Sequence, residues 1–141
     1  VEAAAKVKEA GILLSATVIL GLGGVKGSER HVAETARILT EMDPDYAGAL
    51  TLTLIPGTAL YKEWERGEFE LITPFDSLRE LKGLVENSTF TNCFFSSMHA
   101  SNYFAIRGSM PKDRDKILKQ LNALLSRKDP HMLRPEYMRG L

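Results

Sequence analysis

The chain has 141 residues, 44% of them hydrophobic, enough for one domain with a hydrophobic core. Basic and acidic residues number 18 each, so no net charge favours binding to nucleic acid or acidic lipid. A single cysteine, Cys93, excludes an internal disulfide and a cysteine-rich metal cage, and we expect no metal ligands in this chain. The longest apolar stretch, residues 11–24, is shorter than a bilayer span. We therefore expect a cytoplasmic protein with no membrane contact.

The first ten residues, VEAAAKVKEA, predict a helix that ends at Gly11. Because they begin without methionine and already in helical register, we expect the chain to be a piece of a longer protein. Residues 12–20, ILLSATVIL, predict a strand rich in β-branched residues. Its nearly continuous apolar character favours a parallel strand that is buried on both faces.

A glycine-rich turn, GLGG at 21–24, follows this strand, and Ser28 is expected to cap a helix that runs to about Met42. Residues 46–55, YAGALTLTLI, alternate threonine with leucine and predict the second strand. The turn residues Pro56, Gly57 and Thr58 close it.

The second half of the chain predicts two helices, a strand and a further helix. We expect a short helix over 60–66 and another that begins at Asp76 or Ser77 and ends near Asn87. Residues 89–97 predict a third strand, and residues 112–127 a last helix with Pro111 near its first turn. Alternating helices and strands predict an α/β fold with about three mainly parallel strands, flanking helices and a C-terminal helical extension. Three strands are too few to close a barrel, so the sheet is either open or part of something larger.

The segment GLGGVKGS invites a comparison with phosphate-binding loops, in which glycine amides and a helix N-terminus meet an anion. Its spacing fits neither GxGxxG nor the P-loop. A strand-to-helix turn that needs positive φ is the favoured interpretation.

Polar residues also follow the third strand, in SSMHASNY at 96–103. Because the carboxyl ends of parallel strands meet at one edge of a sheet, these residues are expected near GLGG and PGT. Ser97, His99 and Asn102 are either a donor-rich site or a hydrogen-bonded loop, and the sequence favours neither. Cys93 lies among apolar residues and is expected to be a core thiol.

Several motifs together resemble one family. They are VILGLGG, the spaced residues Ser28, His31, Glu34, Thr35 and Ala36, the DPDY turn, ALTLTLIPGTALY, and HASNY. This succession, which covers nearly the whole chain, resembles the C-terminal part of radical S-adenosylmethionine (SAM) proteins. It is similar in particular to Fe–S oxidoreductases related to the oxygen-independent coproporphyrinogen oxidases.

The resemblance implies a partial (β/α)6 TIM-like barrel that holds SAM and a [4Fe–4S] cluster and generates a 5′-deoxyadenosyl radical. Residues 1–88 would be the C-terminal part of that barrel, and residues 89–141 a strand and helix extension. Carried over by motif, the candidate adenosyl contacts are Leu20, Gly21, Leu22, Thr53, Leu54 and Ile55. Ser97, His99 and Asn102 would face the substrate or a domain interface.

The chain departs from the family in one decisive respect, because the CxxxCxxC motif that holds the cluster is absent. We therefore expect SAM and the cluster to bind the full-length parent, with no cofactor bound by this piece, which would be inert alone. Its expected partners are the missing N-terminal part and an unidentified small-molecule substrate. Exposed strand edges would also cause self-association. The alternative hypothesis is a non-enzymatic α/β module for nucleotide binding or association.

Overall fold

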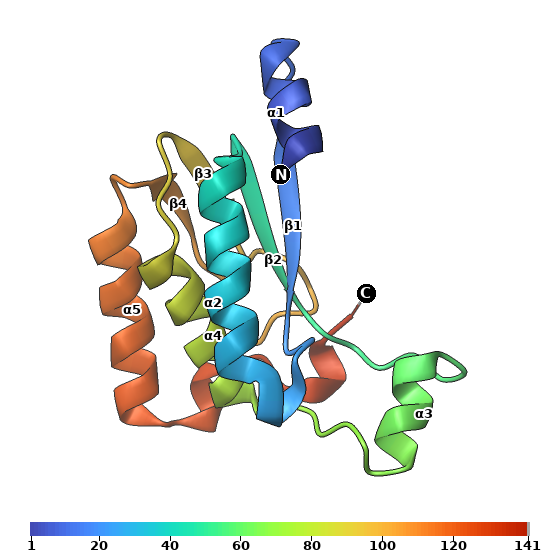
Figure 1. Ribbon diagram of the computed structural model, residues 1–141. Helices are drawn as coiled ribbons and strands as arrows, with labels where there is room; N and C mark the ends of the chain where they lie inside the picture. The colour runs from blue at the N-terminus through green and yellow to red at the C-terminus, as the bar shows by residue number, and fades with distance from the viewer. Residues whose placement is uncertain (141) are drawn as a thin grey trace.

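The computed structural model describes residues 1–140 and contains one four-stranded sheet (Figure 1). The strand order is β1-β2-β3-β4, in which β1, β2 and β3 run parallel and β4 is antiparallel to β3. The strands are β1 Ser15–Leu20, β2 Tyr46–Thr51, β3 Cys93–Ser96 and β4 Arg107–Met110. The expected α/β class with a mainly parallel sheet is confirmed, and the sheet is open.

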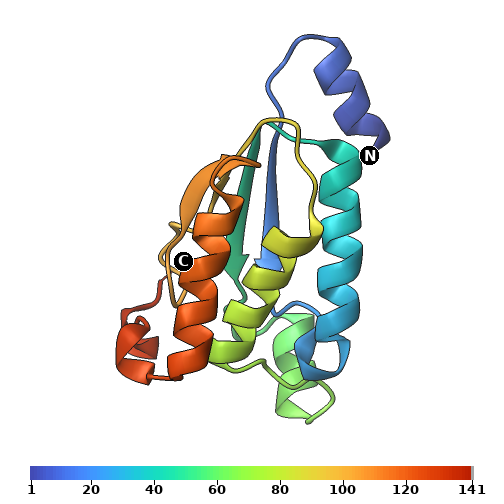
Figure 2. The same cartoon turned by 90° about the vertical axis from the view of Figure 1, so that its left-hand side faces the viewer.

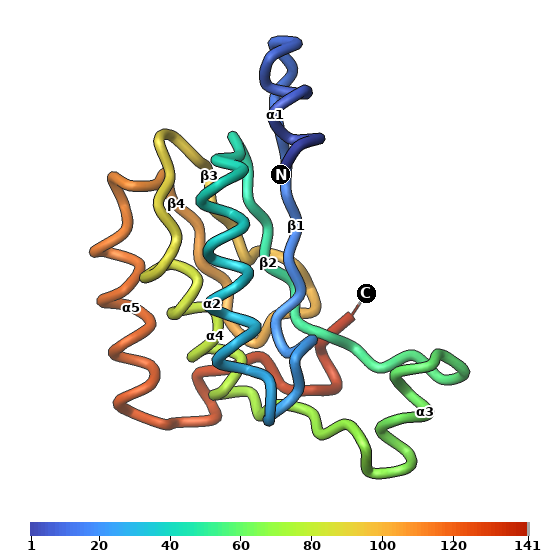
Figure 3. Tube along the Cα trace, in the orientation of Figure 1, coloured from blue at the N-terminus to red at the C-terminus, as the bar shows by residue number. Residues whose placement is uncertain are grey.

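Three long helices lie side by side over one face of this sheet (Figure 2). They are α2 Gly24–Met42, α4 Pro74–Asn87 and α5 Arg114–Arg127. The shorter helices α1 Glu2–Glu9 and α3 Ala59–Glu65 extend away from this body (Figure 1). The C-terminal tail carries two 3₁₀ turns, Pro130–Met132 and Glu136–Met138, and returns toward the point where β2 leaves the sheet (Figure 3).

Side chains alternate between the two faces of the sheet, and only the helix-covered face is packed. Ala49 and Phe95 are fully buried beneath the helices. On the other face Ile19, Tyr46 and Phe94 are 39%, 47% and 41% exposed. The expectation that the first strand is buried on both faces is therefore wrong, because no layer covers that side of β1.

One hydrophobic core joins the helices to the sheet. Its members include Leu39 of α2, Leu81 of α4, Phe95 of β3 and Leu121 of α5. The core thus contains residues from both sides of position 88. The predicted boundary at that position, between a barrel part and an extension, remains a prediction.

The strand β4 was not expected from the sequence, because RGSM carries no run of apolar residues. It forms by pairing with β3, so that Phe95 lies opposite Gly108. A Cβ on Gly108 would come within 2.7 Å of Asp113 Cβ, and glycine therefore allows close packing against the start of α5.

Two helix starts also differ from expectation. α2 begins at Gly24 rather than Ser28. α4 begins at Pro74, because Thr73 and Asp76 form a reciprocal capping box: the Thr73 hydroxyl accepts from Asp76 N at 3.1 Å, and the Asp76 carboxylate accepts from Thr73 N at 3.2 Å.

Other boundaries move by a few residues. β2 ends at Thr51, earlier than expected, because its neighbour β1 ends at Leu20 and the chain turns away at Gly21. Leu52 N still donates to Leu20 O at 2.9 Å. The third strand is also shorter than the expected 89–97, the first strand starts three residues late, and α5 begins two residues after position 112.

Among residues 1–140, no helix has both the length and the apolar character that crossing a membrane requires.

The free edge of β1 generates a testable prediction, since β1 pairs with β2 on one side only. We expect the 141-residue chain to self-associate as its concentration rises, by edge-to-edge pairing of β1. Thr17→Lys, at an exposed position of β1, should shift the chain toward monomer, because antiparallel pairing would bring two like charges together. Multi-angle light scattering measures the mass.

Gln120→Lys on the exposed side of α5 adds the same charge away from the edge and should leave the association unchanged. A wild-type chain that stays monomeric at millimolar concentration would contradict the prediction.

Candidate functional site

A cavity of about 330 Å³ lies at the carboxyl ends of β1 and β2, and we call it the strand-end pocket. Carboxyl ends of parallel strands are where ligands bind in α/β folds. The residues that line it come from both strand ends, the α3 arm and the C-terminal part: Leu20, Thr51, Leu52, Thr53, Leu54, Tyr61, Trp64, Leu71, Ile72, Tyr103, Glu136 and Arg139.

Three of the six predicted adenosyl contacts, Leu20, Thr53 and Leu54, line this pocket. Gly21 lies directly behind its wall, where a Cβ would be 3.1 Å from Ile72 Cδ1. Leu22 and Ile55 are 48% and 41% exposed and are not among the lining residues. The fold thus brings the two predicted strand ends together, and the ligand contacts themselves stay predictions.

The short helix α3 supplies an aromatic side to the pocket. Its N-cap is Thr58, whose hydroxyl accepts from Tyr61 N at 3.3 Å. The Tyr61 and Trp64 rings stand 5.3 Å apart between centroids at an angle of 53°. Such rings offer a flat apolar surface to a planar ligand.

Arg139 from the tail supplies the polar side, and the fold uses its donors fully. Its guanidinium donates to Leu52 O at 2.9 Å, Ser101 O at 2.6 Å and Tyr103 Oη at 2.7 Å. It also pairs with Glu136 at 2.6 Å and lies 4.3 Å from the Tyr103 ring centroid. Only 7% of the side chain is exposed, so Arg139 clamps the end of β2 and is not a free anion receptor.

Tyr103 links this clamp to the carboxylate of Glu136. Burial and a hydrogen bond donated to Glu136 raise the pKa of Tyr103 to about 12, although the charge of Arg139 acts in the opposite direction. Burial also opposes ionisation of Glu136, but hydrogen bonds from Tyr103 and Arg139 outweigh it and lower the pKa of that carboxyl. Tyr103 is therefore a neutral donor rather than a base.

The polar loop after β3 is organised by its own hydrogen bonds. Ser97, fully buried, donates to Phe104 O at 3.2 Å and accepts from Ile106 N at 2.9 Å. Asn102, 3% exposed, donates to Ala49 O at 2.7 Å and accepts from Thr51 Oγ1 at 2.8 Å. These bonds fasten the loop to the end of β2.

His99 stands at the outer end of the same loop and is half-buried. Its Nδ1 lies 2.9 Å from Ser101 Oγ, and Ser101 Oγ accepts from Thr51 N at 3.1 Å. Ser97, His99 and Asn102 therefore lie together beside β2, outside the lining of the strand-end pocket, and their role toward substrate or interface stays a prediction.

Two amides of the GLGG turn, those of Gly21 and Gly24, donate to acceptors within the protein. Gly21 has φ +83° and Gly24 φ +60°, as a positive-φ turn requires. Gly24 N donates to Gly21 O and Val25 N to Glu70 O, both at 3.0 Å. These contacts argue against a phosphate cradle, because the amides at the start of α2 already have acceptors.

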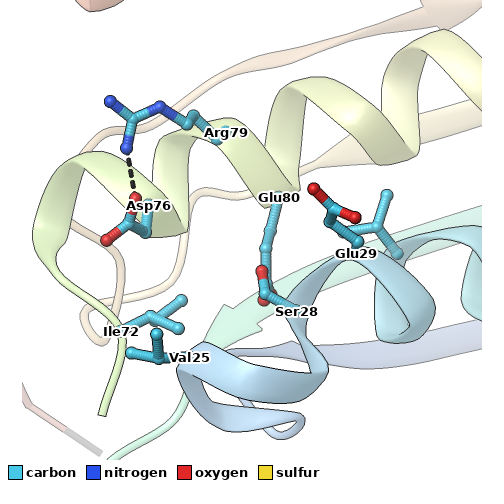
Figure 4. Close-up of a pocket in the computed structure, with 8 residues that line it drawn as sticks. Val25, Ser28, Glu29, Ile72, Asp76, Arg79 and Glu80 are labelled. Atoms are coloured by element: carbon cyan, nitrogen blue, oxygen red, sulfur yellow. Dashed lines mark hydrogen bonds and ion pairs between the residues drawn. The ribbon is translucent and has the colours of Figure 1, made fainter.

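A buried glutamate on α4 completes the turn (Figure 4). Glu80, 1% exposed, accepts from Gly21 N at 2.7 Å and from Ser28 Oγ at 2.6 Å. It also borders a second cavity of about 410 Å³ between α2 and α4, where Arg79 pairs with Asp76. In the sequence Glu80 is marked only by its charge at the edge of the apolar stripe of α4, and the sequence does not predict its role.

The residues present do not fit an iron–sulfur cluster. Cys93, the one thiol, is fully buried in the core. Among residues 1–140, no group of three or more His, Cys, Asp or Glu side chains could hold a metal ion. The strand-end pocket offers an apolar and aromatic surface, and its contact with the adenosyl part of SAM stays a prediction.

No protein-family model, no curated protein and no solved structure matches this chain. The geometry of the chain and the motifs of its sequence are therefore the observations that bear on its function.

Cys93 should be chemically inert in the folded chain. Burial raises the pKa of its thiol to about 11, with smaller contributions from the charges of Asp43 and Asp45. A shift of that size lowers the thiolate fraction at pH 8 by about a hundredfold. We expect alkylation by iodoacetamide to be at least about a hundredfold slower than in the urea-unfolded chain, and to accelerate with pH until about 11.

Mass spectrometry of the quenched reaction measures the labelled fraction. Complete labelling of the folded chain within minutes at pH 8 would contradict the buried position of Cys93.

The Arg139 clamp predicts a loss of stability on truncation. Arg139→Ala removes several charge-assisted hydrogen bonds and leaves buried carbonyls unpaired, so we expect a loss of about 2–4 kcal/mol. Arg139→Lys should recover only part of it, because an ammonium cannot reproduce the planar fork. Urea unfolding followed by the fluorescence of Trp64 measures the change.

The matched control is Arg127→Ala at the exposed end of α5, which should cost less than about 0.5 kcal/mol. Equal losses of unfolding free energy in Arg139→Ala and Arg127→Ala would show that the Arg139 clamp does not stabilise the fold.

Proposed function

We propose that this chain is the C-terminal part of a radical SAM Fe–S oxidoreductase, a cytoplasmic enzyme. In this proposal residues 1–88 belong to a partial (β/α)6 TIM-like barrel and residues 89–141 form its extension. The observation that carries the proposal is the strand-end pocket, since its walls are the two strand ends on which the family motifs VILGLGG and LTLTLIPGT fall. In barrel enzymes the active site lies at this end of the strands.

The uncovered face of the sheet also supports the proposal. Ile19, Tyr46 and Phe94 would line the inside of the barrel, and the free edge of β1 would pair with a strand of the missing N-terminal part. An isolated domain would not ordinarily leave such large side chains exposed on one sheet face.

The chain's own residues would bind and shield the adenosyl moiety. Leu20, Thr53 and Leu54 would contact it, and the Tyr61 and Trp64 rings would exclude water from its far side. Gly21, Leu22 and Ile55 remain proposed contacts at the ends of the same strands. Bound SAM, reduced by a cluster, supplies a 5′-deoxyadenosyl radical in this family.

The cluster and most of the SAM site would belong to the N-terminal part, so the chain alone would be inert. The substrate is an unidentified small molecule that would approach from the open face of the sheet, with Ser97, His99 and Asn102 near the boundary between substrate and neighbouring domain.

A second candidate is a non-enzymatic module that binds a nucleotide. One observation favours it, because the strand-end pocket exists in this chain without any further segment.

The longer protein that contains this chain provides the test. After anaerobic reconstitution with iron and sulfide and reduction by dithionite, we expect a brown protein that converts SAM to 5′-deoxyadenosine. Leu54→Trp should raise the KM for SAM by about tenfold, because the larger side chain fills the pocket, while iron content stays unchanged. Liquid chromatography of 5′-deoxyadenosine measures turnover.

Lys119→Trp on the exposed side of α5 adds the same ring away from the pocket and should leave the KM unchanged. A reconstituted protein that takes up no iron contradicts the enzyme proposal. Calorimetric binding of a nucleotide to the 141-residue chain at micromolar affinity would instead support the module.

A further inference from the structure

We infer that Glu80 is a positioning residue, which fixes the carboxyl end of β1 and so shapes the strand-end pocket from outside it. The identity of the ligand in this inference rests on the proposed function. The position of the carboxyl end of β1 does not depend on the proposed function, and it can be measured separately.

The geometry begins with two short hydrogen bonds to one carboxylate. Oε2 accepts from Gly21 N at 2.7 Å and Oε1 from Ser28 Oγ at 2.6 Å. The partners lie 59 and 52 residues earlier in the chain, so the carboxylate fastens the helix α4 to the first residue after β1 and to the first turns of α2. Figure 4 shows the side chain directed from α4 toward Ser28 at the start of α2.

Stability alone does not call for a carboxylate at this position. Its neighbours on α4, Leu78 and Leu81, are 1% exposed, as is Glu80 itself. Burying a carboxylate costs several kcal/mol before its hydrogen bonds are counted, and a well-packed apolar side chain is often as stable. What an apolar side chain cannot do is accept the Gly21 amide.

That amide belongs to a crowded turn whose backbone conformation favours glycine. Gly21 is the first residue beyond β1 and has φ +83°. Its Cα faces Ile72, since a Cβ there would lie 3.1 Å from both Ile72 Cδ1 and Cγ1. Leu20 and Ile72 both line the strand-end pocket, whereas Glu80 does not. Glu80 therefore acts on the pocket through the peptide group of Gly21.

The second oxygen provides an internal control. Ser28 lies in the first turns of α2 and borders the other cavity, not the strand-end pocket. Ser28→Ala removes one hydrogen bond from the same carboxylate but leaves the bond to Gly21 in place. If Glu80 had a purely structural role, Glu80→Ala and Ser28→Ala would affect the strand-end pocket similarly. If it positions the end of β1, Glu80→Ala should affect the pocket and Ser28→Ala should not.

The enzymatic test uses the SAM-cleaving parent protein. We expect Glu80→Ala to raise the KM for SAM about tenfold with a smaller change in kcat, and Glu80→Gln to raise it less, because one amide oxygen can still accept from Gly21 N. Ser28→Ala and the exposed Glu86→Gln on the same helix should leave the KM within about twofold. Equal effects of Glu80→Ala and Ser28→Ala on KM would overturn the inference.

A second readout uses the 141-residue chain and needs no SAM chemistry. Hydrogen exchange of the Gly21 amide, followed by NMR, should accelerate about 10- to 100-fold in Glu80→Ala, by a smaller factor in Glu80→Gln, which keeps one acceptor oxygen, and stay near wild type in Ser28→Ala. Unchanged exchange in both Glu80 variants would overturn the inference even if the parent cleaves SAM. Accelerated exchange together with a parent that does not cleave SAM would support the positioning role and reject the proposed function. If Glu80→Ala does not fold, Glu80→Gln carries both measurements.

Discussion

The alternation of side chains in a sheet that packs on one face only governs the rest of this structure. Ala49 and Phe95 meet the helix layer, and their neighbours Tyr46 and Phe94 point the other way into open space. Because α2 and α4 lie on the same side of the sheet, the connections from β1 to β2 and from β2 to β3 both return over that side (Figure 2). The consequence is that the carboxyl ends of β1 and β2 emerge together at one edge, where side chains of α3, of the loops at Ile72 and Tyr103 and of the tail surround the strand-end pocket.

Those two strand ends are held by groups of opposite charge that arrive from distant parts of the chain. Glu80 accepts from the amide just beyond β1, and Arg139 donates to the carbonyl of Leu52 just beyond β2. A backbone group at the end of a strand has lost its ladder partner and needs another, and a charged side chain forms the stronger hydrogen bond. The strand-end pocket lies between the two fixed points, which gives its walls a defined spacing before any ligand binds.

The sequence predicted what depends on local pattern and missed what depends on distant partners. The helix 28–42 and the alternation at 46–55 were recognised from periodicity, and the positive-φ turn at GLGG from its glycines. β4 was missed because RGSM becomes a strand only by pairing with β3. The exposed face of β1 was missed because apolar composition does not say whether a second layer exists. Three of the six proposed adenosyl contacts line the pocket, but Glu80 and Arg139 carry no spacing signal, since their partners stand 59 and 87 residues away.

Under the proposed function, an ordered pocket wall would be compatible with a piece that is inert alone, because affinity depends on the whole set of ligand contacts. A site of micromolar affinity corresponds to about −8.2 kcal/mol, and one of millimolar affinity to about −4.1 kcal/mol. If half of the contacts to SAM belong to the missing N-terminal part, the half that remains gives about the millimolar value, however well its walls are positioned. Positioning by Glu80 and Arg139 would then lower the cost of organising the proposed site in the complete protein without creating a functional site in this piece. Under the proposed function, the same division would let this chain contribute a pocket wall to a radical SAM site that the complete protein forms.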